Sequence, residues 1–215
     1  MKPKILVCVL CGGERHYWIH PSLALMLIAM AKDSRFEVLI QTVTDKRPVD
    51  FARNFCVSLA EAKRATWLLM IDNDESVRSN PLDVLLLAGD KKIIGIPAAQ
   101  LSVGPTISGP VITTSTEGPI SQDEHFVEVK AVGSGVLFVH HEVWERMGQP
   151  LFFTTYKNLR EVDTGEDFNF CHSARDAGFN VFATKFVANH FHTAETASQA
   201  SLLYQAIEAQ VSHRA

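Results

Sequence analysis

Apolar runs alternate along this chain with segments in which apolar residues recur every three or four positions. The runs predict strands at Lys4 to Leu10, Phe36 to Val43, Trp67 to Asp72, Lys92 to Ile96, Phe126 to Lys130, Val136 to His140 and Asn180 to Ala188. The periodic segments predict helices at Pro21 to Ala31, Val49 to Thr66, Pro81 to Ala88, Glu142 to Met147 and Glu166 to Ala177. This order predicts one α/β domain with a mostly parallel central sheet, flanked by helices and joined by right-handed crossovers.

The pattern of the helix expected from Val49 to Thr66 indicates which of its side chains face the core. The bulky apolar residues Phe51, Phe55 and Leu59 favour one inner face, which leaves Arg53 and Asn54 on other faces. The pattern therefore predicts that the two polar side chains lie away from the core.

Residues 97–126 change character, because glycine, proline, serine and threonine accumulate there. We expect an irregular or mobile insertion that becomes ordered from Ser102 to His125 only with a ligand bound. The predicted domain is residues 1–193, and residues 194–215 form a helical tail that begins near Glu195. Its apolar stripe is expected either to dock on the chain's own domain or to pair with another subunit, which would give a homo-oligomer.

Composition narrows the class of protein. The chain has 215 residues, 47% of them hydrophobic, and a formal charge of −4 with a pI near 6.1. Such a chain can bury one good core and lacks the basic face expected of a nucleic-acid-binding protein. Its longest apolar stretch, Leu23 to Ala31, is far shorter than the roughly 20 residues that span a bilayer. We expect a cytoplasmic protein without a membrane span.

The four cysteines include a C-x-x-C pair, Cys8 and Cys11. A redox pair normally lies at a helix N-terminus, whereas these two lie on a predicted strand and face opposite ways. A zinc site would need a second pair. The pattern favours buried, reduced thiols.

The abrupt end of one apolar strand carries the first candidate chemistry. Trp67 to Ile71 is apolar throughout and runs directly into Asp72, Asn73 and Asp74, followed by Glu75. In open α/β sheets, ligands bind at the carboxyl ends of such strands. Two carboxylates there repel each other unless a hard cation or a basic residue compensates. This indicates a divalent-metal site, and the alternative is a polar turn whose Asp caps a helix.

Two further groups are weaker when taken singly. Glu166 and Asp167 follow Gly165 at the start of a predicted helix, where acidic residues commonly complement the helix dipole. His190 and His192 follow the last predicted strand and share one side if that strand continues. A histidine at the end of a strand is more often a satisfied structural residue than a ligand. Together with the first group, however, they would supply ligands and a base at one edge of the sheet.

In this arrangement the chain resembles the GT-A glycosyltransferases, which use nucleotide-sugar donors. The resemblance extends from Lys4 to about Thr193 and rests on four segments in the family's order. These are Ala52-Arg53-Asn54 on the helix before the metal motif, Trp67 to Asp74 as the strand ending in D-x-D, Val132 to Gly148, and Gly165-Glu166-Asp167 as x-E-D. The glycine-rich middle segment and the loop from Cys11 to His20 depart from the family's pattern.

The resemblance implies a metal cofactor and a donor site. It makes Asp74 a direct metal ligand, Asp72 a ligand through water or a contact to the donor's ribose, and His190 the third ligand with His192 as the substitute. Mixed carboxylate and imidazole ligands favour Mn²⁺ over Mg²⁺. The implied contacts to the nucleotide sugar come from Arg53, Asn54, Asp72, Asn73, Gly133 and Ser134. Arg53 would complement the diphosphate charge.

The resemblance also implies a reaction. Asp167 would act as the general base on an acceptor hydroxyl and Glu166 would steer the acceptor, so that a hexosyl group is transferred with inversion. A UDP-sugar is the expected donor, although the residues do not separate UDP from other nucleoside diphosphates. The acceptor can be a glycan, a lipid or a protein.

Two other classes of function remain open at this point. A nucleotidyltransferase shares a sheet edge with paired acids and a metal, and the loop from Gly12 to Arg15 is a faint version of its phosphate loop. A non-catalytic protein that binds a nucleotide or a sugar is the other alternative.

Overall fold

The computed structural model of the chain describes residues 2–12, 19–44, 46–77, 79–99, 121–158, 161–185 and 188–190. Its helices are α1 (Pro21–Ala31), α2 (Val49–Ala62), α3 (Asp83–Leu87), α4 (His141–Met147) and α5 (Glu166–Asp176). The longer strands are β1 (Lys4–Cys11), β2 (Glu37–Thr44), β3 (Trp67–Asp72), β8 (Phe126–Val129), β9 (Val136–His140), β10 (Thr155–Asn158), β11 (Glu161–Thr164) and β12 (Val181–Thr184). The shorter strands are β4 (Glu75–Ser76), β5 (Ile93–Gly95), β6 (Ala98–Ala99), β7 (Ser121–Gln122) and β13 (Ala188–His190).

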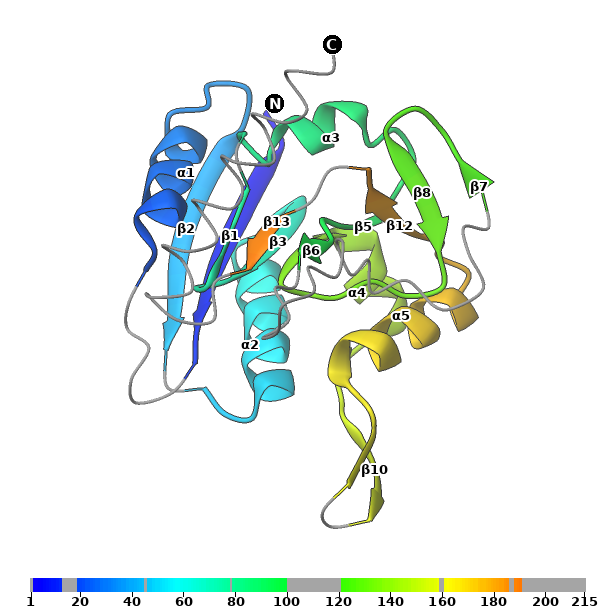
Figure 1. Ribbon diagram of the computed structural model, residues 1–215. Coiled ribbons are helices and arrows are strands. Elements are labelled where there is room, and N and C mark those ends of the chain that lie inside the picture. Colours follow the sequence, from blue (N-terminus) through cyan, green and yellow to red (C-terminus); the bar gives the residue numbers. More distant parts are fainter. Residues whose placement is uncertain are drawn as a thin grey trace, which may run out of the picture.

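One 8-stranded sheet organises the molecule, with the strand order β2-β1-β3-β9-β5-β12-β8-β7 (Figure 1). The strands β2, β1 and β3 pair in parallel, and so do β5 and β12. Strand β9 lies between β3 and β5 and is antiparallel to both. The two parallel halves therefore run in the same direction, and their carboxyl ends share one edge of the sheet. The predicted α/β class with helices on a mostly parallel sheet is confirmed.

Each face of the sheet carries its own hydrophobic core, because the side chains of a strand alternate between the two faces. On one face, α1 and α3 contribute buried residues such as Leu23, Met26 and Val84. On the other face, α2, α4 and α5 contribute buried residues such as Val57 and Phe170. The central strands are consequently apolar on both sides, as a sheet covered by helices requires.

Helix α2 corrects the expectation for its inner face. It ends at Ala62 rather than at Thr66, and Arg64 has a positive φ of 52° just beyond it. The buried face carries small residues and Arg53, whereas Phe51 is 53% exposed. The phenylalanine pattern was misleading because a buried ion-pair network, described below, holds the guanidinium of Arg53 inside.

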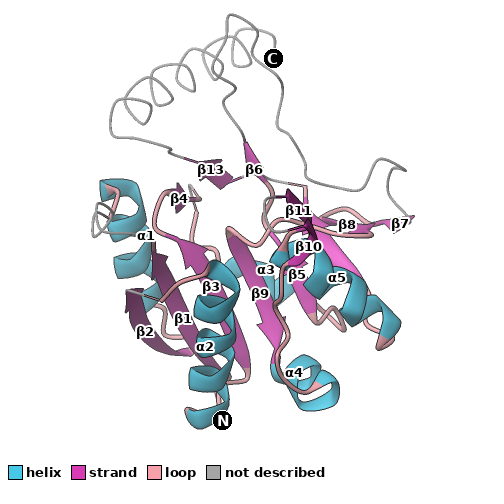
Figure 2. Ribbon diagram, turned by 90° about the horizontal axis from the view of Figure 1, so that it is seen from below, coloured by secondary structure: helices cyan, strands magenta, loops and turns pink. Residues whose placement is uncertain are grey.

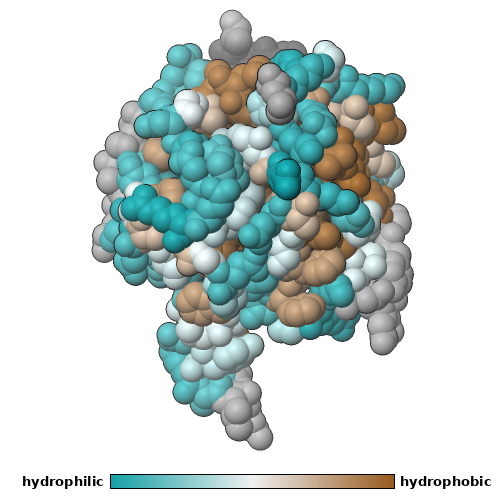
Figure 3. Space-filling model, turned by 180° about the vertical axis from the view of Figure 1, so that it is seen from behind, coloured by the Kyte–Doolittle hydropathy of each residue, from teal (hydrophilic) through white to brown (hydrophobic). Residues whose placement is uncertain are grey.

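Two other expectations differ in detail from the structure. The last predicted strand is in fact two strands, because β12 belongs to the large sheet and β13 to a small sheet with the order β4-β13-β6 (Figure 2). The polar segment before α5 forms the antiparallel hairpin β10–β11, which projects from the body (Figures 1 and 3). The expected ordering of Ser102 to His125 falls largely on residues outside the described part of the chain. The expected tail helix lies wholly outside it.

The four cysteines are free and buried, as the sequence predicted. Cys8 and Cys11 belong to the cores on opposite faces of the sheet. Within the described residues, no helix has both the length and the apolar character needed to cross a membrane.

Candidate functional site

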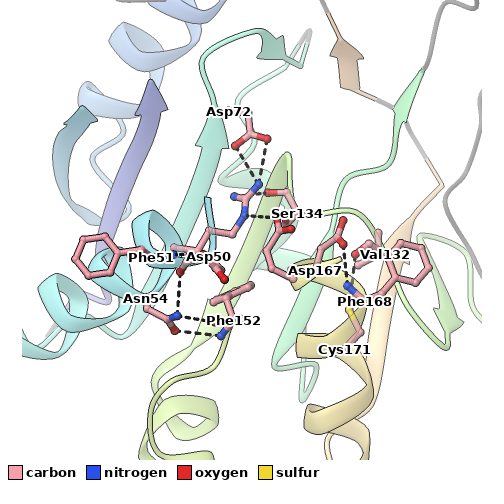
Figure 4. Close-up of polar contacts among 12 residues, drawn as sticks. Asp50, Phe51, Asn54, Asp72, Val132, Ser134, Phe152, Asp167, Phe168 and Cys171 are labelled. Atoms are coloured by element: carbon pink, nitrogen blue, oxygen red, sulfur yellow. Dashed lines mark hydrogen bonds and ion pairs between the residues drawn. The ribbon is translucent and has the colours of Figure 1, made fainter. Parts of the chain in front are cut away.

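Arg53, on α2, bonds three segments that lie far apart in the sequence, and Figure 4 shows two of its partners, Asp72 and Ser134. Its Nη2 donates to both carboxylate oxygens of Asp72, at 3.2 and 3.1 Å, and its Nε donates to Oε1 of Glu166 at 3.1 Å. Its Nη1 donates to the carbonyl oxygen of Ser134 at 3.2 Å. A single guanidinium therefore joins the end of β3, the segment before β9 and the first turn of α5.

Arg53 is itself only 2% exposed, and no other lysine or arginine among the described residues is buried. Burial alone would lower the pKa of this guanidinium, but the charges of Asp72 and Glu166 raise it. Arg53 is therefore a permanent buried cation. A buried charge of this kind is tolerated because it is paired and hydrogen-bonded.

The D-x-D segment lies where the sequence predicted, at the carboxyl end of β3. The N–H of Asp72 donates to the carbonyl of Gly135 at 2.8 Å, and the N–H of Asn73 donates to the carbonyl of Leu10 at 3.0 Å. The Asp72 side chain is 31% exposed. Burial of its carboxyl, aided by the nearby charges of Asp74 and Glu166, raises the pKa of Asp72, and Arg53 opposes this shift.

No functional role was expected for Glu75 from the sequence. It is 4% exposed, and burial together with the charges of Asp72 and Asp74 raises the pKa of its carboxyl well above the ordinary value. Its side chain lies against Gly135, where a Cβ would overlap the carboxylate. Its position directly after D-x-D was the available signal, but its side chain packs against Gly135, which is distant in the sequence.

Glu166 and Asp167 occupy the first turn of α5. Glu166 faces Arg53, and the side chain of Asp167 accepts a hydrogen bond from the N–H of Phe168 at 2.8 Å. Burial and the neighbouring charge of Glu166 raise the pKa of Asp167, whereas the Phe168 N–H and Arg53 lower it. Asp167 is thus held close to Glu166, with an elevated proton affinity that suits a general base.

The remaining residues expected to bind the donor have mainly internal contacts. The Asn54 side chain accepts hydrogen bonds from the N–H groups of Leu151 and Phe152 and donates to the carbonyl oxygens of Phe152 and Asp50. Ser134 is buried and offers its carbonyl to Arg53. The donor-binding roles given to Arg53, Asn54, Asn73, Gly133 and Ser134 stay predictions.

The C-terminal histidines are only partly located. Strand β13 pairs antiparallel with β4, and this pairing places the backbone of His190 opposite Glu75. The chain thus returns from residue 188 to the D-x-D segment, as the metal-site hypothesis requires. His192 lies outside the described residues, and both assignments as metal ligands stay predictions.

A second group of potential metal ligands, His140, His141 and Glu142, lies at the start of α4. The ligand atoms of the three lie within 4.8 Å of one another. Because His140 pairs in register with Trp67 at the beginning of β3, this group lies at the opposite end of that strand from Asp72. Lys92 already bonds Glu142 at 2.8 Å, and Nδ1 of His140 caps the helix by accepting from the N–H of Glu142.

The acidic cluster is suited to a divalent cation. It consists of Asp72, Asp74, Glu75, Glu166 and Asp167, with Arg53 at its centre. Among the described residues, Arg53 is the one buried guanidinium beside these five carboxylates, and oxygen ligands are those that Mg²⁺ and Mn²⁺ prefer. The donor set therefore fits such an ion.

Comparison with known proteins identifies structures of similar fold but no sequence family. No protein-family model matches the sequence, and no curated protein matches it either. The structure is similar to the crystal structure of A197 from STIV, with a TM-score of 0.56, 16% identity, and coverage of 89% of this chain and 86% of that one. Crystalline GalNAc-T7 with UDP, GalNAc and Mn²⁺ matches with a TM-score of 0.52 and 11% identity, over 90% of this chain and 44% of that one.

A third structure, apo UDP-glucose pyrophosphorylase, aligns over 81% of this chain and 66% of that one with 11% identity and a TM-score of 0.45. A TM-score below 0.5 is too low to establish a shared fold. At these identities the two better matches indicate the fold alone. This chain has the Rossmann-like fold of GT-A type.

Proposed function

We propose that this protein is a metal-dependent glycosyltransferase that moves a sugar from a nucleoside-diphosphate donor to a hydroxyl acceptor with inversion. One observation carries the proposal. Arg53 bonds both Asp72 of the D-x-D segment and Glu166 of the x-E-D segment. These two residues are 19 and 113 positions from Arg53 in the sequence, and the bonds bring their motifs together at one edge of the sheet. A glycosyltransferase needs these two groups together, one for the donor and one for the acceptor.

The donor side is assigned to the carboxyl end of β3. Asp74 and Asp72, with His190, would hold Mn²⁺ or Mg²⁺, which supplies positive charge to the departing nucleoside diphosphate. Arg53 fixes the orientation of Asp72, because both oxygens of that carboxylate accept from the same Nη2. Rigid placement of this kind matters because misplacement of a catalytic group by an ångström slows a reaction greatly.

The acceptor side is assigned to the first turn of α5. Asp167 takes the proton from the acceptor hydroxyl as that oxygen attacks the anomeric carbon, and the bond to the leaving diphosphate breaks. Glu166, held by Arg53, orients the acceptor beside it. The elevated pKa of Asp167 increases its affinity for this proton.

Turnover of nucleotide sugars tests the proposal. Release of nucleoside diphosphate from a panel of UDP-, GDP-, CDP- and dTDP-sugars would be measured with simple sugars as acceptors, with Mn²⁺ and with a chelator. We expect one donor to react only with Mn²⁺, and Asp167→Asn to lose at least ~100-fold in rate while donor binding is retained.

The same experiment separates the alternatives. Release of pyrophosphate from a nucleoside triphosphate and a sugar phosphate would establish a nucleotidyltransferase instead. Donor binding without any turnover, in wild type and Asp167→Asn alike, would favour a protein that only binds nucleotide sugars.

A further inference from the structure

One side chain of the acidic cluster is incompletely bonded. Oε2 of Glu75 is buried and has no hydrogen-bond partner, and it is the only such side-chain atom in the described part of the chain. An unsatisfied buried polar group destabilises a fold, and does so more strongly when it is charged. Such a group in a native site commonly marks a position where an absent ion or ligand binds.

The position of Glu75 places this oxygen next to the proposed donor site. Glu75 follows Asp74 directly, and its side chain packs on Gly135, the residue whose carbonyl accepts the N–H of Asp72 at 2.8 Å. The absence of a Cβ at Gly135 provides the space for the carboxylate. The backbone of His190 lies opposite Glu75 on β13. Glu75 is thus surrounded by the segments that hold the other expected ligands.

The bonding of Asp72 leaves a cation short of negative charge at this site. Both oxygens of Asp72 already accept from Arg53, whose positive charge offsets the negative charge that this carboxylate could offer to a cation. A hard divalent cation needs further anionic oxygens, and Oε2 of Glu75 is a buried carboxylate oxygen without a competing donor. No lysine or arginine other than Arg53 is buried among the described residues to serve this oxygen instead, and the buried His140 lies at the far end of β3.

We propose that Glu75 is a direct carboxylate ligand of the divalent cation, beside Asp74. The proposal rests on the proposed function, since it takes the cation site as given and adds a ligand outside the D-x-D pattern. It also explains why residue 135 is glycine, because any larger residue would displace the carboxylate from its position.

Binding of Mn²⁺ alone tests the inference without any turnover. Free Mn²⁺ would be followed by electron paramagnetic resonance during titration of wild type, Glu75→Gln, Asp74→Asn and the control Glu124→Gln. Glutamine has nearly the same shape as glutamate and fits beside Gly135, and the Glu124 side chain is 88% exposed. We expect Glu75→Gln to raise the Mn²⁺ dissociation constant ~10- to 100-fold, and Glu124→Gln to leave it unchanged.

The outcomes distinguish a failure of the role assigned to Glu75 from a failure of the proposed function. Wild-type affinity in Glu75→Gln, with affinity lost in Asp74→Asn, would overturn the role of Glu75 and leave the proposed function intact. Absence of Mn²⁺ binding by wild type would overturn both. If Glu75→Gln does not fold, Glu75→Asp decides, because it keeps the charge but withdraws the carboxylate by one methylene. Weaker binding by Glu75→Asp supports the inference, and unchanged binding contradicts it.

Discussion

At the scale of single residues, Arg53 determines how the candidate site is built. It brings a positive charge into the protein interior and distributes it over Asp72, Glu166 and the carbonyl of Ser134. Its role in the structure is therefore to organise the carboxylates, and its contact with a diphosphate stays a prediction. The burial of Arg53 could not be predicted from the helix pattern, since its partners lie 19 and 113 residues away.

Replacement of Arg53 is expected to destabilise the whole protein. Arg53→Leu leaves Asp72 and Glu166 without their cation, and the free energy of unfolding should fall by about 3 kcal/mol, the lower end for a broken buried pair. Urea unfolding measures this. The control is Lys157→Leu, because Lys157 pairs with Glu161 where both side chains are 56% exposed, and the loss of that pair should change stability far less. Equal effects of the two variants would contradict the buried network.

The pH dependence of turnover should report on Asp167. A base must be deprotonated, so the rate should fall as pH decreases through the pKa of Asp167, which burial and Glu166 raise above the ordinary aspartate value. Glu166→Gln removes one raising charge and frees Arg53, and both changes lower this pKa. The acidic limb of the rate profile should therefore move to lower pH in Glu166→Gln. A limb that does not move would remove Asp167 from the role of base.

At the scale of elements, the strands and helices follow the hydrophobic pattern closely where both ends have local signals. Helix α1 begins at Pro21 with His20 as its cap, and α4 ends before Gly148, which has a φ of 71°. The hydrophobic pattern did not predict features that long-range contacts determine, such as the division of the last strand into β12 and β13. That division depends on pairing with β4 and β6, which no local signal predicts.

The hairpin β10–β11 depends on one side chain of α5. Nδ2 of Asn169 donates to the carbonyls of Phe153 and Thr164 and to Oγ1 of Thr155, and so holds the base of the hairpin. Because this hairpin leads directly into the first turn of α5, its position affects the placement of the candidate base.

Loss of this contact should loosen the hairpin while the body stays folded. In Asn169→Ala, chymotrypsin should cleave after Tyr156, which is 61% exposed, about tenfold faster than in wild type, equivalent to about 1.4 kcal/mol of local stability. Lys157→Ala is the control, since its pairing with Glu161 is exposed and contributes little. Equal cleavage of wild type and Asn169→Ala would show that other contacts hold the hairpin.

At the scale of the whole molecule, sheet topology assembles the site. Strand β9 enters between β3 and β5 in the antiparallel sense, so its beginning, rather than its end, lies beside Asp72. The sequence predicted the class of fold and the edge that carries the acids. It did not predict the entry of β9, which places Gly135 against Glu75, because the strand order of a sheet is set by contacts between distant segments.

Thermal melting with a panel of nucleoside diphosphates, each with and without Mn²⁺, tests the central claim most directly. Wild type and Asp74→Asn would be compared under the same conditions. We expect one diphosphate to stabilise wild type only when Mn²⁺ is present. At ~100 times its dissociation constant, this diphosphate should raise the free energy of unfolding by about 2.7 kcal/mol. Asp74→Asn should lose this stabilisation. Absence of a shift with every diphosphate, or an equal shift without Mn²⁺, would contradict a metal-dependent donor site at the end of β3.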